Sequence, residues 1–143
     1  LRVAYGNVSG YEPADGVTYD YFTTIEGIME KEDASIEEFE VPQRLKDLYK
    51  TKDYGAYGVN GTLPVAFVAS NHTTGGNSGS PVLNANGELI GTNFDRVWEG
   101  TMSDIDFDPD RCRNISLDIR YTLFVIDKYA GCSRLIQEMK IVN

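Results

Sequence analysis

One stretch decides how this chain folds and what it does: TTGGNSGSP, residues Thr73–Pro81. Gly76 and Gly79 allow backbone angles that a side chain would forbid. The loop can therefore expose the Ser78 hydroxyl and turn the N–H groups of Gly76 and Ser78 toward one point. Two N–H donors beside a nucleophile make an oxyanion hole, which stabilises the charge on a carbonyl oxygen under attack. The segment predicts Ser78 as a catalytic nucleophile and Gly76 as part of the oxyanion hole.

The alternative for this segment is an ordinary Gly/Ser/Asn loop between two strands. A phosphate-binding P-loop is disfavoured, because that motif continues with Lys and then Ser or Thr, whereas Ser80-Pro81 follow Gly79 here. The nucleophile elbow of α/β-hydrolases is also disfavoured, because G-x-S-x-G needs glycine two residues after the serine. Ser80 stands at that position, and no helical pattern follows.

The residues after the loop predict a strand, a turn and a second strand. Pro81–Leu83 is apolar, Asn84–Gly87 carries the Asn-Gly hairpin signal, and Glu88–Phe94 resumes a strand. Pro64–Ala69 predicts the strand that leads into the loop, and Pro42–Lys50 a short helix. Over the whole chain we expect about six strands and then two helices.

The C-terminal part predicts helices from about residue 116 to residue 139. Ser116 is a plausible N-cap for a helix from Leu117 to Ala130 that ends at Gly131, and Ser133 can cap a final helix through Met139. We therefore expect one domain over residues 1–143: a mainly β fold, a six-stranded antiparallel β-barrel with C-terminal helices.

The chain resembles chymotrypsin-class serine peptidases. Its serine loop resembles the nucleophile loop of glutamyl endopeptidases, and a longer stretch resembles the bacterial serine dipeptidyl peptidases of the dipeptidyl peptidase 7 and 11 family. The resemblance covers most of the chain and is carried by His72–Gly100, Tyr19–Thr24, Met29–Asp33 and Asp118–Tyr121. It implies the C-terminal barrel of a chymotrypsin-like double-barrel protease, a fragment of a longer chain with a signal peptide upstream, and a place in the bacterial periplasm or at the cell surface.

The general base for Ser78 is expected to lie outside this chain. His72 is the only histidine, and in chymotrypsin-type order the histidine and aspartate come well before the serine. We therefore expect His72 to be structural or to flank the substrate. The resemblance implies that the base and its carboxylate partner come from an N-terminal part, so the 143-residue chain alone is expected to be inactive.

Phe94, Asp95 and Arg96 are the candidate substrate-binding residues. If the strand continues through Phe94, then Phe94 and Arg96 face one way and Asp95 the other. A guanidinium in a pocket pairs with a substrate carboxylate. The resemblance implies that Arg96 marks the dipeptidyl peptidase 11 type, which cleaves after Asp or Glu, and that Asp95 helps to bind the free α-ammonium. The alternative for Asp95 is a carboxylate that only offsets Arg96. Trp98 is expected to pack against the barrel wall.

The composition of the chain limits the kinds of partner it can bind. The formal net charge of −9 argues against nucleic acid and anionic membranes, and no apolar run reaches the ~20 residues that span a bilayer. No cofactor or metal is implied; the two cysteines leave a disulfide possible. We expect peptide substrates with acidic residues and, for the intact protein, a homodimer. Two functions stay open beside the dipeptidyl peptidase: a glutamyl-type endopeptidase, and a non-catalytic binding module that keeps the serine loop.

Overall fold

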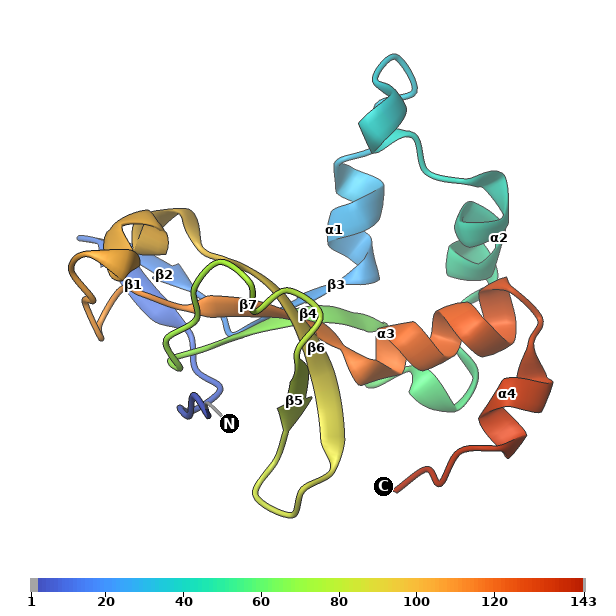
Figure 1. Cartoon of the computed structure of the whole chain (residues 1–143). Coiled ribbons are helices and arrows are strands. Elements are labelled where there is room, and N and C mark those ends of the chain that lie inside the picture. Colours follow the sequence, from blue (N-terminus) through green and yellow to red (C-terminus); the bar gives the residue numbers. More distant parts are fainter. Residues whose placement is uncertain (1–2, 143) are drawn as a thin grey trace. The chain divides into compact units, whose positions relative to one another are not determined.

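The computed structural model describes residues 3–142, which divide into two compact units. The first unit comprises Leu1–Thr23 and Ala66–Asp118, and the second comprises Thr24–Val65 and Ile119–Asn143. The first unit is built mostly from strands and the second mostly from helices (Figure 1). The expected mainly β fold with C-terminal helices is confirmed, and its strands are arranged in two sheets.

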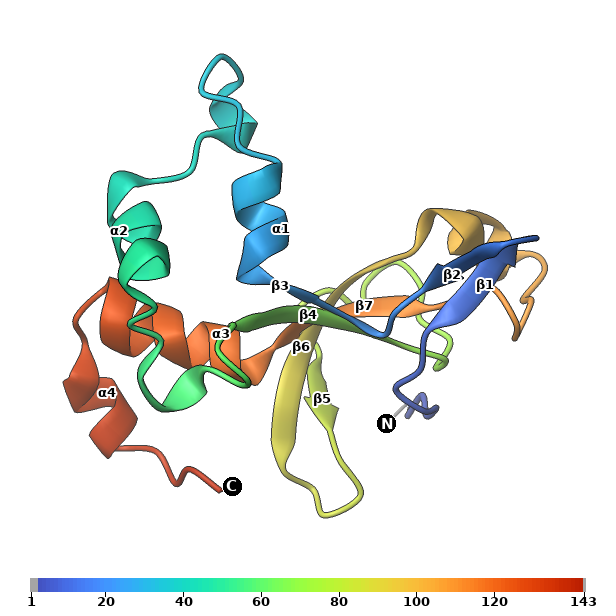
Figure 2. The ribbon, with the colours of Figure 1, turned by 180° about the vertical axis from the view of Figure 1, so that it is seen from behind.

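The strands form two sheets. β1 (Tyr11–Ala14) and β2 (Val17–Tyr19) pair as an antiparallel hairpin. The other sheet has the order β3-β4-β7-β6-β5, with antiparallel ladders between β4 and β7, β7 and β6, and β6 and β5 (Figure 2). Its strands are β3 (Phe22–Thr24), β4 (Pro64–Ala69), β5 (Pro81–Leu83), β6 (Leu89–Arg96) and β7 (Asn114–Asp118).

The hairpin of β5 and β6 forms as local turn chemistry predicts. Gly87 adopts a φ of +79°, which favours glycine. The Asn84 side-chain oxygen accepts hydrogen bonds from the N–H groups of Asn86 and Glu88, at 2.9 and 3.0 Å. This Asx-type turn fixes the register that carries β6 back beside the serine loop.

The central strands bury a face that is largely polar. Residues directly opposite each other in an antiparallel pair lie on one side of a sheet, and Ser116 faces both Phe67 on β4 and Asn93 on β6. All three are buried, and Ser116 is fully inaccessible. Gly91 makes room here, because a Cβ atom at this position would lie 2.8 Å from the Phe67 ring.

The predicted helix from Leu117, capped by Ser116, is wrong at its start. Asn114–Asp118 forms β7, and α3 begins only at Ile119. In β7 the polar residues Asn114, Ser116 and Asp118 are buried, so the period-two pattern is inverted relative to an ordinary half-buried strand. The predicted end of the helical stretch is confirmed, because Gly131 closes it with a φ of +69°.

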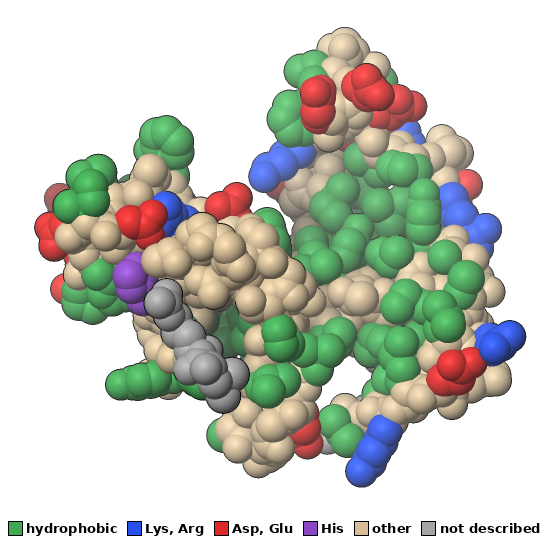
Figure 3. Space-filling view, in the orientation of Figure 1, with side chains coloured by type: hydrophobic (Ala, Val, Ile, Leu, Met, Phe, Trp, Pro, Cys, Tyr) green, Lys and Arg blue, Asp and Glu red, His purple; other side chains and the backbone are tan. Residues whose placement is uncertain are grey.

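The second unit is held by an apolar core of its own. α2 forms as predicted and buries Leu45. Hydrophobic side chains also gather on the visible face of this unit (Figure 3). Its helices are α1 (Ile25–Glu30), η1 (Glu37–Phe39), α2 (Gln43–Thr51), η2 (Gly55–Tyr57), α3 (Ile119–Phe124), the π-helical η4 (Val125–Tyr129) and α4 (Ser133–Gln137). Its core consists of Ile25, Val41, Leu45, Tyr54, Tyr57, Leu63, Leu123 and Phe124.

Candidate active site

The serine loop is a compact turn held by its own backbone. The N–H of Asn77 donates to the carbonyl of Thr74 at 3.1 Å, and the side-chain oxygen of Asn77 accepts from the N–H of Thr74 at 2.9 Å. Gly76 and Gly79 adopt φ values of +94° and +83°. Side-chain-bearing residues rarely adopt such angles, so both glycines are needed for this path of the chain.

β6 anchors the loop through Asn93. The N–H of Gly79 donates to the Asn93 carbonyl at 2.8 Å, and the N–H of Asn93 donates to the Ser80 carbonyl at 2.9 Å. The Asn93 side-chain amide adds a bond to the Asn77 carbonyl at 3.1 Å. Ser78 therefore lies between two residues that are both tied to the same strand position.

Ser78 itself is exposed, and its hydroxyl donates to the carbonyl of Phe94 at 3.2 Å. Within residues 3–142, the N–H groups of Gly76 and Ser78 have no protein acceptor, whereas those of Asn77, Gly79 and Ser80 all do. Two free donors on either side of Asn77 are what an oxyanion hole requires. The convergence of these donors on one point stays a prediction.

His72 has a packing partner away from Ser78. Its ring lies against Phe107, with ring centroids 4.8 Å apart. In the described part of the chain no hydrogen bond joins His72 to Ser78. This placement agrees with a structural or flanking role for the histidine.

A β-bulge at Phe94 changes which residues of β6 share a face. Asn93 pairs with Ser116 and Arg96 pairs with Asn114, but Asp95 pairs with Ile115, so Phe94 is one extra residue. The expectation that Phe94 and Arg96 face the same way by simple alternation is wrong. The bulge instead places Arg96 on the buried face with Asn93 and Asn114.

A chain of side-chain amides continues from the loop into the sheet. The Asn114 amide nitrogen donates to the side-chain oxygen of Asn93 at 2.9 Å and to the Ser116 hydroxyl at 3.2 Å. These residues are buried. Sequence reasoning missed Asn93, Asn114 and Ser116. The alternating polar residues at 114, 116 and 118 were the available signal.

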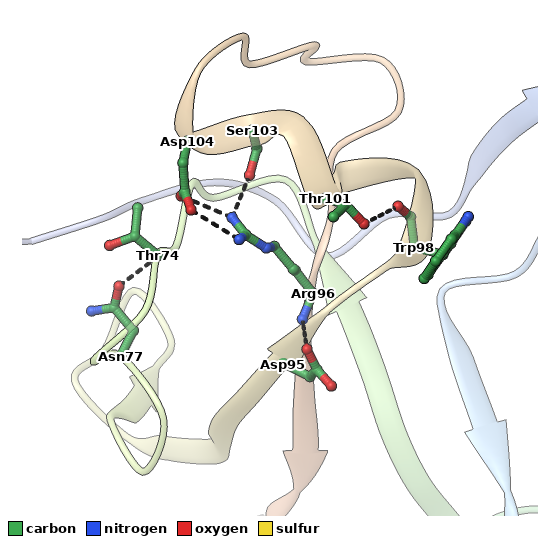
Figure 4. A network of polar contacts seen from close by, with 8 residues as sticks. All are labelled: Thr74, Asn77, Asp95, Arg96, Trp98, Thr101, Ser103 and Asp104. Atoms are coloured by element: carbon green, nitrogen blue, oxygen red, sulfur yellow. Dashed lines mark hydrogen bonds and ion pairs between the residues drawn. The ribbon is translucent and has the colours of Figure 1, made fainter.

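The Arg96 guanidinium is held by the 3₁₀ helix η3 (Trp98–Asp104). Two parallel bonds reach the Asp104 carboxylate at 2.8 and 2.9 Å, and a third reaches the Ser103 hydroxyl at 2.9 Å (Figure 4). These bonds hold the pKa of Asp104 below its usual range and raise the pKa of Arg96 further. Sequence reasoning missed both partners, because residues 100–113 give no periodic pattern.

Asp95 and Trp98 point elsewhere. Asp95 is exposed, and its carboxylate accepts from the backbone N–H of Arg96 at 2.8 Å, while the guanidinium turns away toward Asp104 (Figure 4). Trp98 is 86% exposed, so the expectation that it packs against the barrel wall is wrong. Val97 takes the buried position beside it.

Residues 3–142 contain neither a disulfide, nor a metal-binding cluster, nor a helix that could cross a membrane. Cys112 is buried and Cys132 is exposed, and both are free thiols. Among residues 3–142 there is no cluster of three His, Cys, Asp or Glu side chains suited to a metal ion. No helix in the same range is both long and apolar enough to cross a bilayer.

The family model described as Peptidase S46 matches residues 1–141. The Asp/Glu-specific dipeptidyl-peptidase of Capnocytophaga gingivalis is 62% identical over 144 residues, which cover 100% of this chain and 20% of that protein. Dipeptidyl-peptidase 7 of Phocaeicola vulgatus is 56% identical over the same 100% of the chain and 20% of its own length.

The solved structures give the same match. The crystal structure of Porphyromonas endodontalis DPP11 in complex with the dipeptide Arg-Asp superposes with a TM-score of 0.93 at 56% identity, covering 96% of this chain and 20% of that one. The chain thus spans about a fifth of the length of the relatives it matches.

Proposed function

The chain belongs to the peptidase S46 family, and we propose that it forms the serine-bearing part of a longer dipeptidyl peptidase that cleaves after Asp or Glu. In this proposal residues 1–143 are the C-terminal barrel of the peptidase domain with its C-terminal helices. The similarity to an enzyme named Asp/Glu-specific supports it. So does the exposed serine on a loop with two free N–H donors.

Ser78 is the nucleophile in the proposed reaction. A base from the rest of the enzyme takes the Ser78 proton as Oγ bonds to the carbonyl carbon of the second residue of the peptide. The N–H groups of Gly76 and Ser78 hold the oxyanion. The C–N bond then breaks, and the leaving amine takes the proton. Water hydrolyses the resulting acyl-enzyme and releases the dipeptide.

Arg96 reads the residue before the cleaved bond. The observation that carries this assignment is the bulge, which puts the guanidinium on the same face of β6 as the Asn93 side chain that anchors the serine loop. A guanidinium there favours a carboxylate by charge and by two-pronged geometry. An apolar side chain would leave it without a substrate partner.

Asp95 and Phe94 complete the proposed substrate site. Asp95 is exposed one residue before Arg96 and carries a charge that can hold the α-ammonium of the substrate. Phe94 is 46% exposed and accepts the Ser78 hydroxyl bond through its carbonyl. Its ring is therefore available to the peptide beside the nucleophile.

We place the intact enzyme in the bacterial periplasm or at the cell surface, as a chymotrypsin-like aminopeptidase that acts on oligopeptides as a homodimer. The relatives described above come from bacteria. Cell fractionation and the mass of the purified enzyme in solution test these two assignments.

Arg96→Gly in the full-length enzyme tests the assignment of Arg96. The kcat/KM for substrates ending in Asp or Glu should fall by about 100-fold, because a desolvated carboxylate loses its partner. The kcat/KM for substrates ending in Leu or Met should stay the same or rise. Arg111→Gly, at an arginine 58% exposed and outside the site, is the control. An equal loss on all four substrates would contradict the assignment.

An experiment with N-terminally blocked peptides on the full-length enzyme distinguishes the exopeptidase from a glutamyl endopeptidase. Blocking the substrate's N-terminus should abolish cleavage if a free ammonium is recognised. Full activity on blocked peptides would instead favour the endopeptidase, and no acyl-enzyme at Ser78 with any peptide would favour a binding module.

A further inference from the structure

Resting on the proposed function, we propose that Asp104 is a built-in competitor of the substrate. Its carboxylate occupies the edge of the Arg96 guanidinium that the acidic side chain of the substrate would bind. Asp104 thereby weakens the binding of acidic substrates and sets how strongly the enzyme prefers them. It acts through Arg96 and does not touch the reacting atoms.

The hydrogen bonds of Arg96 show which edge is taken. A guanidinium has five N–H donors, two on each terminal nitrogen and one on Nε. One terminal nitrogen donates to Ser103 and to one oxygen of Asp104, and the other donates to the second oxygen of Asp104. Asp104 thus fills the end-on edge with the two-pronged geometry that a carboxylate ligand uses.

The space beside the guanidinium supports direct competition. Arg96 lines a cavity of about 10 Å³ together with His72, Ser103 and Asn114. A volume of that size holds about one water and is too small for a carboxylate side chain. Asp104 does not line this cavity, so the cavity offers an acidic side chain no second route to Arg96 beside the edge that Asp104 occupies.

Asp104 and Ser103 differ in how easily they can move. The Asp104 side chain is 46% exposed at the last residue of η3, whereas Ser103 is only 5% exposed. Asp104 can thus swing into solvent while Ser103 keeps its bond to the guanidinium. The charges also weaken the binding of acidic substrates. Arg96 and Asp104 neutralise each other, so a substrate carboxylate would add an unbalanced negative charge.

The test compares Asp104→Asn with Asp106→Asn in the full-length enzyme. Asp106 is an exposed carboxylate two residues further on, so its variant changes the net charge equally without touching Arg96. Exposed ion pairs are worth up to about a fivefold change in an equilibrium constant, and loss of the like charge adds to this. We expect the KM for substrates ending in Asp or Glu to fall about three- to tenfold in Asp104→Asn, with kcat nearly unchanged. The KM for Leu and Met substrates should stay constant, and this also shows that the variant is folded.

Four outcomes overturn the proposal. A higher KM for acidic substrates in Asp104→Asn would mean that the carboxylate orients Arg96 for binding. An unchanged KM would mean that substrate uses another edge. An equal fall in Asp106→Asn would mean a general charge effect. A fall that persists in the Arg96→Gly background would mean that Asp104 does not act through Arg96. If Arg96→Gly alone keeps the wild-type selectivity for acidic substrates, the proposed function fails instead.

Discussion

Asn93→Ala should loosen the serine loop without unfolding the sheet. The substitution removes the amide bond to the Asn77 carbonyl at 3.1 Å and the bond from Asn114 at 2.9 Å, while both backbone bonds of Asn93 to the loop remain. A net hydrogen bond contributes about 0.5–1.5 kcal/mol. The loss of two therefore costs about 1–3 kcal/mol.

The larger penalty for orphaned buried groups does not apply in full. The Asn77 carbonyl still accepts from the N–H of Ser80 at 3.0 Å, and the Asn114 amide still reaches Ser116 at 3.2 Å. We therefore expect a loss near 2 kcal/mol. Misplacing a nucleophile by about 1 Å can cost on the order of 100-fold in rate, so kcat should fall by tenfold or more on every substrate.

Two measurements on the full-length enzyme check this prediction. Hydrogen exchange of the Gly79 amide should accelerate by about 30-fold, which corresponds to 2 kcal/mol. The kcat for acidic and apolar substrates should fall together. Asn86→Ala is the matched control, because the Asn86 side chain is exposed at the hairpin turn. If Asn93→Ala behaves like Asn86→Ala in both measurements, the amide network does not hold the loop.

Two further predictions concern the fold. Gly91→Ala should prevent normal packing, because the new Cβ would lie 2.6 Å from the Leu117 carbonyl oxygen; Gly27→Ala, which meets nothing within 4 Å in α1, should instead stabilise by about 0.5–1 kcal/mol, and equal thermal shifts would contradict the packing argument. The hydrogen bond from Ser133 at 2.6 Å lowers the pKa of Asp127, so its stabilisation is present above the unfolded pKa of about 3.9 and disappears as the pH falls through the folded pKa. Asp127→Asn should therefore flatten the acid limb of the unfolding free energy against pH, and an unchanged limb would exclude Asp127 as its source.

The parts of the structure that could be predicted from the sequence are those that depend on local interactions. The serine loop and the Asn84–Gly87 turn depend on glycine angles and short-range hydrogen bonds, which follow from neighbouring residues. β7 could not be predicted in the same way, because its buried side chains are polar and are satisfied by partners about 20 residues away, such as Asn93 for Asn114. The helix prediction extended into this strand because Ser116 can cap a helix and α3 begins only two residues after Leu117.

The placement of Arg96 could not be predicted from its neighbours either. The bulge exists only as a mismatch between β6 and β7, so no property of β6 alone reveals it. Asp104 is an acidic residue in a stretch without periodicity, and only the folded η3 brings its carboxylate to the guanidinium.

The extra residue in β6 makes the charge on its buried face depend on how the strand pairs with β7. With Phe94 as the extra residue, Arg96 lies opposite Asn114 on that face. Pairing of the same residues without the bulge would set Phe94 opposite Ile115 and Asp95 opposite Asn114, so that a negative charge would replace the positive one beside the serine loop. Loss of Phe94 itself would remove the bulge and leave Arg96 where it is. The sign of that charge is therefore set by the register between the two strands as well as by their residue types.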